Sequence, residues 1–294
     1  MSHLSHIPRL GFRPPAGYAF DIEVFSAHDW LERIPENQFR YPSRLDFHQL
    51  ILVTHGLFGH TVDFKLESTR KGSILVMWPG QVQRFESNKP WDGWVVIFRP
   101  ESFQPTASTG SQPPGFTVAD LPVQIVLGKV SFEPVREAMK QMHQDARLTG
   151  QMQLVGALEQ AQLQALLIRL QLAGEQLQAS PEKDSSLAKH FRKFRQATEQ
   201  RFCEWHQISV YAKALGISEK TLSRATQEVA GLSAKAYLST RIALEAKRML
   251  AYTSWPIAHV ADKLGFDEAT NFIKFFRREA GYAPSEFRKH HRSR

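Results

Sequence analysis

Two runs of polar side chains in the last third of the chain have the types and spacing to form hydrogen bonds with a nucleic acid. The first run comprises Lys220, Ser223, Arg224 and Gln227, and the second comprises Thr270, Asn271, Lys274, Arg277 and Arg278. Each run advances in steps of one, three or four residues, so its members would share one face of a helix. Arginine presents a fork of donors that matches a guanine edge, whereas lysine suits phosphate oxygens. The runs therefore predict two helices that contact duplex DNA.

The residues around the first run predict the helices that would hold it in place. Helical spacing of apolar residues extends over 187–205 and 209–215, and Gly216 follows as a residue that accepts a left-handed turn. Ser218 is a suitable cap for a helix that runs to about Ala230. A short helix, a glycine turn and a capped helix have the spacing of a helix-turn-helix unit.

The same arrangement occurs a second time. A helix over 257–264 is expected to end at Gly265, and Asp267 is expected to cap the next helix, which runs to Ala280. The buried side of that helix would be supplied by Phe272, Phe275 and Phe276. A single helix over 233–251 would join the two units; at 1.5 Å per residue it is roughly 28 Å long. Such a helix could set two recognition helices about one DNA turn, roughly 34 Å, apart.

The charge of the chain is divided unevenly between its two parts. Residues 1–185 contain 17 Lys and Arg against 19 Asp and Glu, a net charge of −2, whereas residues 186–294 contain 20 against 10, a net charge of +10. All the excess positive charge therefore lies beside the predicted helix-turn-helix units. This distribution is expected of a phosphate-binding module joined to a neutral partner domain.

The first 130 residues predict strands rather than helices. Short runs with strand character are Phe20–Phe25, His48–Thr54, Thr61–Leu66, Ser73–Trp78 and Gly93–Phe98. Strands at this spacing, without amphipathic helices between them, favour an antiparallel sandwich or barrel. Two helices are then predicted over about 133–147 and 151–178, which makes the chain as a whole an α+β protein.

The second of these helices has a stripe of leucines. Its members, with one glutamine, are Leu154, Leu158, Gln162, Leu163, Leu166, Leu167, Leu170 and Leu177. Such a stripe packs either in the core of its own domain or against a second subunit. A polar segment, 179–185, follows as a linker, and both interpretations stay open.

A larger set of residues in the two helix-turn-helix units carries a resemblance. It comprises Ala212, Gly216, Ile217, Ser218, Leu222 and Arg224 in the first unit, and Ala258, Ala261, Leu264, Gly265, Phe266, Phe272, Phe275, Phe276, Arg277, Arg278, Gly281, Pro284, Phe287 and Arg288 in the second. In type and spacing, over about 190–290, this set resembles the AraC-type family of bacterial transcription regulators. Thr226 departs from the pattern, because the family usually has a bulky apolar residue there. We therefore expect looser packing in the first unit.

The resemblance implies DNA contacts at particular positions. They are Lys220, Ser223, Arg224 and Gln227 on the first recognition helix, and Ala269, Thr270, Asn271 and Lys274 on the second. Arg277 is added because it shares the outward face of the second helix. Arg224 would contact guanine or act as a phosphate clamp. Lys274 and Arg277 are expected at phosphates, and Asn271 either contacts a base or braces its own helix.

Three further segments carry a resemblance: Pro42 with Asp46, Phe47, Gln49 and Leu50; Gly72 with Trp78–Val82, Arg84 and Phe85; and Trp94 with Phe98–Pro100. They are similar to the successive strands of the family's effector-binding domain, a cupin-like barrel over about 19–130. Its interior would hold an apolar or aromatic small molecule, with a lining expected from Leu50, Leu52, Val62, Phe64, Val76, Trp78, Trp94 and Val96. The predicted organisation is a cupin-like domain at 1–132, dimerisation helices at 133–178, a linker at 179–185 and an all-α domain with two tandem helix-turn-helix units at 186–294.

A cupin enzyme fused to a DNA-binding module is the main alternative. A cupin metal site needs His-x-His on one strand, but the corresponding positions are Ser43, Leu45 and Gln83. His48, His55 and His60 do not alternate on one flat strand. No paired acid and base or nucleophile motif is present, so we expect neither metal, cofactor nor catalysis.

The remaining expectations concern partners and location. No run of eighteen apolar residues and no secretory signal is found, which predicts a cytoplasmic protein without a membrane partner. The resemblance favours an effector-responsive activator that forms a homodimer and works with RNA polymerase. The alternative is an architectural DNA binder, which would use apolar wedges in the minor groove.

Overall fold

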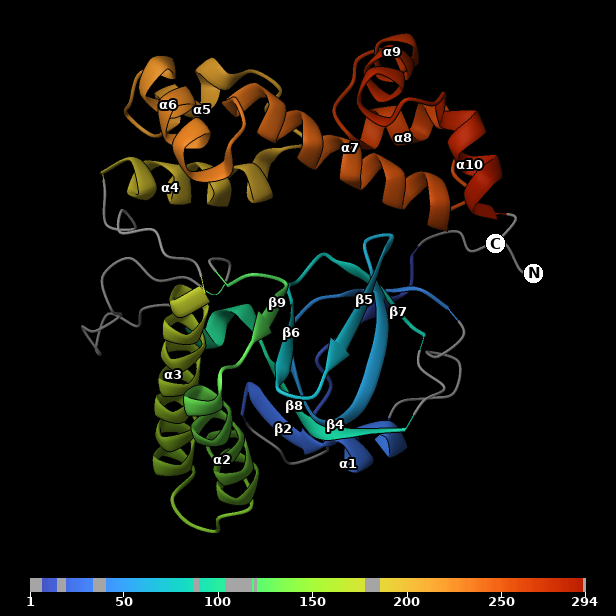
Figure 1. Ribbon diagram of the computed structural model, residues 1–294. Coiled ribbons are helices and arrows are strands. Elements are labelled where there is room, and N and C mark those ends of the chain that lie inside the picture. Colours follow the sequence, from blue (N-terminus) through green and yellow to red (C-terminus); the bar gives the residue numbers. More distant parts are fainter. Residues whose placement is uncertain are drawn as a thin grey trace. The chain divides into compact units, whose positions relative to one another are not determined.

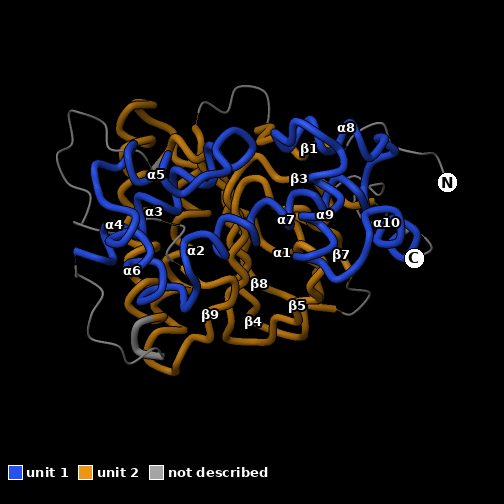
Figure 2. Tube along the Cα trace, turned by 90° about the horizontal axis from the view of Figure 1, so that it is seen from above, with its two compact units in different colours: residues 1–7, 181–294 blue, residues 8–180 orange. Residues whose placement is uncertain are grey.

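The structure is a computed structural model that describes residues 7–14, 20–33, 41–86, 90–103, 118, 121–177 and 186–292. Its strands lie between residues 9 and 126. The chain divides into two units, residues 8–180 and residues 181–294 together with 1–7 (Figure 2). Each unit has its own core and is described separately.

Two sheets that share one long strand form the N-terminal half-barrel. The first sheet contains β1 (Arg9–Leu10), β3 (Ser43–Leu45), β7 (Val82–Phe85), β4 (His48–Val62) and β5 (Lys65–Arg70). The second contains β2 (Ile22–Ser26), β8 (Trp91–Phe98), β4, β6 (Ser73–Met77) and β9 (Gln124–Val126). All pairs are antiparallel except β1 with β3.

Strand β4 passes from one sheet to the other by bending at Gly56. This glycine has a φ of +75°, and a Cβ there would overlap the carbonyl oxygen of Pro90, so no other residue fits. A register shift between Val53 and His55 accompanies the bend. The sequence predicts a strand over 61–66, but the structure has a turn there, at Asp63 and Phe64.

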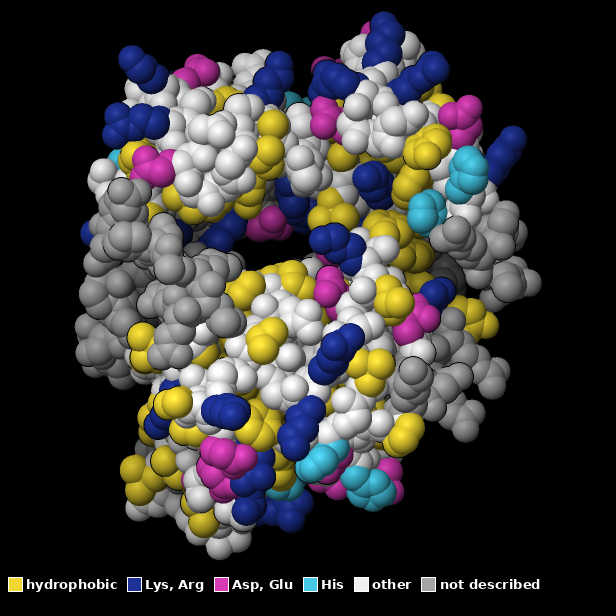
Figure 3. Space-filling view, viewed as in Figure 1, with side chains coloured by type: hydrophobic (Ala, Val, Ile, Leu, Met, Phe, Trp, Pro, Cys, Tyr) yellow, Lys and Arg dark blue, Asp and Glu magenta, His cyan; other side chains and the backbone are white. Residues whose placement is uncertain are grey.

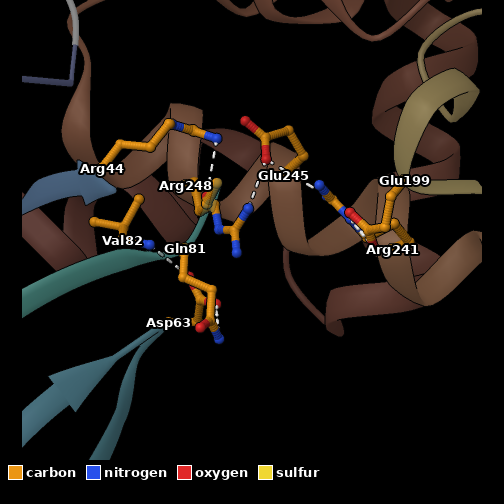
Figure 4. Close-up of polar contacts among 9 residues, drawn as sticks. Arg44, Asp63, Gln81, Val82, Glu199, Arg241, Glu245 and Arg248 are labelled. Atoms are coloured by element: carbon orange, nitrogen blue, oxygen red, sulfur yellow. Dashed lines mark hydrogen bonds and ion pairs between the residues drawn. The ribbon is translucent and has the colours of Figure 1, made fainter. Parts of the chain in front are cut away.

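The turn between β4 and β5 is fixed by a side chain rather than by glycine. Asp63 and Phe64 have φ values of +48° and +73°. Asp63 Oδ1 accepts a hydrogen bond from the Val82 amide over 3.1 Å, and its Oδ2 accepts one from Gln81 Nε2 over 3.2 Å (Figure 4). These bonds to a neighbouring loop hold a backbone conformation that the sequence pattern does not predict.

The second sheet separates two hydrophobic cores. The inner core lies between the sheets and includes Phe58, Phe85, Ile51, Leu75 and Val95. The outer core lies between the second sheet and helices α2 (Lys129–Asp145) and α3 (Met152–Leu177), which run side by side along it (Figure 1). A short helix, α1 (Ala27–Arg33), and a 3-10 turn, Pro100–Phe103, complete this unit.

The leucine stripe of α3 is divided between the core and the surface. Leu163, Leu166, Leu167 and Leu170 are buried in the outer core, whereas Leu154 and Leu158 are 65% and 38% exposed. The side chain of Leu177 and the predicted linker 179–185 lie outside the described residues. The middle of the stripe therefore packs within its own domain.

The C-terminal unit is all helical. Its helices are α4 (Ser186–Arg201), α5 (Ile208–Ala214), α6 (Glu219–Ala230), α7 (Ala234–Tyr252), α8 (Ile257–Lys263), α9 (Ala269–Ala280) and α10 (Pro284–Arg292). Helix α7 connects the pair α5 and α6 to the pair α8 and α9 (Figure 1).

The turns of the two helix-turn-helix units repeat the same hydrogen bond. The amides of Ile217 and Phe266 each donate over 3.0 Å to the carbonyl five residues earlier, at Ala212 and Ala261. Gly216 and Gly265 supply the positive φ values, +67° and +76°. The predicted cap at Ser218 is confirmed, since its side chain accepts from the Thr221 amide.

The predicted cap at Asp267 is wrong. The N-cap of α9 is Glu268, and no side-chain hydrogen bond caps this helix. Ring contacts on its buried side hold α9 instead: Phe272 packs against Phe266 in the preceding turn, and Phe276 packs against Phe287 of α10. Packing therefore contributes to where this helix begins, in addition to its cap.

A charged network ties α4 to α7. Arg241 Nε donates to both carboxylate oxygens of Glu199, over 2.8 and 3.0 Å, and its guanidinium lies 3.9 Å from the Phe202 ring centroid. Glu245 accepts from Arg248 Nη1 over 2.9 Å, and both side chains are nearly inaccessible (Figure 4). This network holds the connecting helix against the helix that precedes the first helix-turn-helix unit.

Candidate nucleic-acid interface and effector cavity

Helix α6 presents the first predicted set of DNA-contacting residues on one face. Lys220, Arg224 and Gln227 are exposed and Ser223 is half-buried. Leu222, Ala225 and Thr226 occupy the opposite, buried side. The structure thus brings the first set together on one accessible face.

Thr226, where the sequence predicts looser packing, occupies a buried position of the first unit. Its side chain is fully buried, and its Oγ1 donates to the carbonyl oxygen of Leu222 over 2.9 Å. The hydroxyl is therefore satisfied within its own helix, so no polar group is stranded in the core.

Helix α9 presents the second set in the same way. Thr270, Asn271, Lys274 and Arg277 are exposed and Ala269 is half-buried, opposite Phe272 and Phe276. Figure 3 shows Lys and Arg side chains over α6 and α9 on the face in view. Both sets therefore belong to accessible, positively charged faces.

Neighbouring arginines on α9 have different surroundings. Arg278 forms an ion pair with Glu279 over 2.8 Å, and its guanidinium lies 5.4 Å from the Phe275 ring centroid. Arg277 forms no ion pair with any residue that the structure describes. Its charge is therefore available to a phosphate.

Three arginines of this unit contact other parts of the protein rather than facing solvent. Arg288 donates to the carbonyl oxygens of Leu250 and Trp255, at the end of α7. Arg241 and Arg248 follow intervals that are typical of a solvated helix face, yet they are engaged in the α4–α7 network. No signal in the sequence distinguishes them from DNA-contacting arginines.

The residues predicted to line the barrel interior lie mostly on the opposite face of the second sheet. Those in the outer core, against α2 and α3, are Leu50, Leu52, Val76 and Val96, with Trp78 and Trp94 packed against them. Only Val62 belongs to the inner core, and Phe64 lies in the β4–β5 turn. The interior position predicted for the outer-core residues is wrong, because strands buried on both faces carry no polar side to mark which face is inner.

A cavity of about 280 Å³ opens beside the inner core. Its apolar lining includes Phe25, Trp30, Phe47 and Ile97, and its polar lining consists of Arg9, Arg13, Arg33 and Gln49. None of the eight predicted effector residues lines it. The lining combines four separate segments of sequence, which is why no local pattern indicates it.

Gln83, one of the residues expected from the sequence to correspond to a cupin metal site, lies beside a histidine. Gln83 Oε1 lies 2.7 Å from His60 Nε2, and burial lowers the pKa of His60 to about 4, so this imidazole is neutral at pH 7. Among the described residues, no three His, Cys, Asp or Glu side chains gather in a way that could hold a metal ion. Likewise, no described helix is long and apolar enough to cross a membrane.

Two protein families match the chain in the order of its two units. The AraC-like ligand binding domain matches residues 21–172, about half of the chain, and a helix-turn-helix domain matches residues 211–290. The first match covers the half-barrel with α2 and α3, and the second covers both helix-turn-helix units.

Curated relatives match over most of their length at low identity. The transcriptional activator RhaS of Enterobacter sp. is 24% identical over 246 residues, which cover 83% of this chain and 86% of the relative. RhaS of Escherichia fergusonii is 23% identical over 258 residues, covering 87% and 90%.

Solved structures of two kinds are similar to parts of the chain. The C-terminal domain of the response regulator AraT from Geobacillus stearothermophilus is 26% identical, with 37% of this chain and 89% of that chain covered and a TM-score of 0.34. ToxT from Vibrio cholerae, with a bound unsaturated fatty acid, is 10% identical over 91% of this chain and 94% of its own, with a TM-score of 0.38. Because these TM-scores are low, the sequence matches decide the assignment: the chain belongs to the AraC family of DNA-binding transcription regulators.

Proposed function

We propose that the chain recognises its DNA site with α6 and α9 together, through Lys220, Ser223, Arg224, Gln227, Ala269, Thr270, Asn271, Lys274 and Arg277. The observation that supports this most directly is the accessible face that each helix presents while α7 joins the two units. Helix α7 has nineteen residues, roughly 28 Å at 1.5 Å per residue, which suits two major-groove contacts about one turn apart.

The half-barrel is the effector-binding part in this proposal. A small molecule bound there would change how the chain acts on transcription. The proposed organisation is an effector-binding domain at 1–132, dimerisation helices at 133–178, a linker at 179–185 and the DNA-binding domain at 186–294. The RhaS relatives are named activators, which supports activation together with RNA polymerase.

A homodimer through α3 completes the proposal. In addition to the buried leucines, α3 carries a second stripe at alternating steps of four and three residues: Leu154, Leu158, Ala161, Ala165, Ile168 and Leu172. All are exposed except the half-buried Ile168. A heptad stripe of this kind is typical of a helix that pairs with its equivalent in a second subunit.

Genome-wide mapping of bound sites, followed by footprinting of the purified full chain, tests the proposal. We expect a shared motif whose half-sites each contain two protected major-groove segments about one turn apart. Binding spread evenly over the genome, or protection of a single segment per half-site, would contradict it. Transcription that does not change at the mapped sites when the chain is deleted would contradict its regulatory role.

A further inference from the structure

The cavity beside the inner core has a positively charged mouth. Arg9 lies in β1, Arg13 follows it, and Arg33 ends α1; all three line the cavity, and no described carboxylate does. Guanidinium groups that line one cavity repel one another where no carboxylate pairs with them, and an anion between them removes that repulsion.

Arg33 differs from Arg9 and Arg13 because its guanidinium group already forms hydrogen bonds within the protein. Its Nη1 and Nη2 donate to the Glu23 carboxylate, and its Nη2 also donates to the carbonyl oxygen of Arg13. Within the described part of the chain, Arg9 and Arg13 form no ion pair. Two guanidinium groups at the mouth therefore remain for a ligand, and each offers the planar fork that matches a carboxylate.

Gln49 also lines the cavity, and its buried side-chain oxygen accepts no hydrogen bond from the described residues. Its side chain is 1% exposed, and its Oε1 has no hydrogen-bond partner within the described structure. Buried amide oxygens are rarely left unpaired, because the loss of water is then not compensated. A hydroxyl or N–H group on a bound molecule would satisfy this oxygen.

The walls between these polar ends are apolar and partly aromatic. Phe25 and Ile97 come from paired strands, while Trp30 and Phe47 lie on α1 and between β3 and β4. A small hydrated anion such as phosphate gains little from such walls, whereas an aryl or alkyl group is removed from water by them.

We propose that the effector is a small organic carboxylate with an aryl or alkyl body. Its carboxylate binds Arg9 and Arg13, its body packs on Trp30 and Phe47, and a hydroxyl or N–H group, where present, donates to Gln49 Oε1. This inference rests on the proposed effector role of the half-barrel and names the chemical class of its ligand.

The test compares acids with their neutral amides on the full-length protein. The probes are hydrocinnamate, its para-hydroxy derivative and hexanoate, each with its primary amide, and inorganic phosphate, measured by calorimetry and thermal shift. We expect the acids to bind roughly tenfold tighter than their amides. Equal binding of acid and amide, tightest binding of phosphate, or no stabilisation by any of the three acids at millimolar concentration would overturn the proposal.

Variants assign the contacts. R9Q combined with R13Q should remove the preference for acid over amide, while R70Q, an exposed arginine outside the cavity, should leave it intact. Q49M should weaken binding of the para-hydroxy probe and leave hydrocinnamate unchanged. An acid preference that survives R9Q/R13Q overturns the assigned contacts.

Sequence-specific DNA binding of each variant is measured in parallel, which separates the two levels of inference. If specific binding persists while the acids fail, the ligand class is wrong and the DNA-binding proposal stands. If specific binding is absent with and without every probe, the proposed function itself fails.

Discussion

His206 Nε2 donates a hydrogen bond to the carbonyl oxygen of Leu264, 2.8 Å away. His206 lies between α4 and α5, just before the first helix-turn-helix unit, and Leu264 caps the first helix of the second, so this bond ties the segment before the first unit to the second unit. Next to it, a Cβ on Gly265 would overlap the carbonyl oxygen of Cys203. Helix α7 is thus not the only element that sets one recognition helix relative to the other.

Replacing His206 with leucine should loosen this junction. We expect H206L to destabilise the C-terminal unit by about 1 kcal/mol, the usual net value of one hydrogen bond. The affinity of H206L should fall for a DNA site that contacts both helix-turn-helix units. Its affinity for a shorter duplex that contacts only the first unit should stay the same. H206Q, which retains a donor, serves as the control in fluorescence anisotropy. Equal losses on both duplexes would mean that the bond stabilises the fold without coupling the units.

Arg224 should determine one base position of the site. We expect R224A to cost roughly 1–3 kcal/mol on the specific duplex and to flatten the preference at a single base pair. The measurement is binding to a set of duplexes that differ at each position, with helical content checked by circular dichroism. Should specific and scrambled duplexes weaken by the same factor, Arg224 is a phosphate clamp.

Arg277 should act through charge alone. R277A is expected to weaken all duplexes about equally and to lower the slope of log affinity against log salt by about one contact. R278A is the matched control, because Arg278 is paired with Glu279 and should change the slope less. A base-specific loss in R277A would contradict the phosphate assignment.

The exposed stripe on α3 should hold two subunits together. We expect L158E combined with A165E to convert a dimer into a monomer in light scattering, because four buried carboxylates would meet at the seam. V130E, at an apolar residue of α2 that is 85% exposed, should leave the dimer intact. A wild-type chain that is monomeric at tens of micromolar, with and without DNA, would remove the basis for this prediction.

The N-terminal unit should lose stability as the pH falls below about 6.5. Burial lowers the pKa of His60 to about 4 from an ordinary 6.5, so the unfolded chain binds more protons between these values. The free energy of unfolding therefore drops through that window, by at most about 1.4 kcal/mol per pH unit for this group. His48, whose pKa is also lowered to about 4 by burial, contributes in the same direction.

H60Q should reduce this slope, and H28Q, at an exposed histidine, should leave it unchanged. Urea unfolding of the full chain at pH 7 and pH 5, followed by pulse proteolysis, gives the comparison. An unchanged slope in H60Q would show that other groups cause the acid sensitivity.

The sequence by itself determines most helices of the C-terminal unit. Its helices depend on contacts three to five residues apart, so Gly216, Ser218 and the faces that carry Arg224 and Arg277 can be identified from local spacing. The error at Asp267 is of one residue, because a helix end is decided by packing as well as by its cap.

Only the tertiary structure decides the cavity proposed to bind the effector. Alternation along β4 and β6 identifies two faces but not which one is inner, since the second sheet is buried on both. The sequence therefore predicts Leu50 in the interior position that Ile51 occupies. The bend at Gly56 and the crossing of β4 between sheets depend on a close approach to Pro90, which is distant in sequence. Arg9, Gln49 and Ile97 meet only because strand pairing closes the half-barrel, and strand pairing is a long-range property that local residue patterns do not encode.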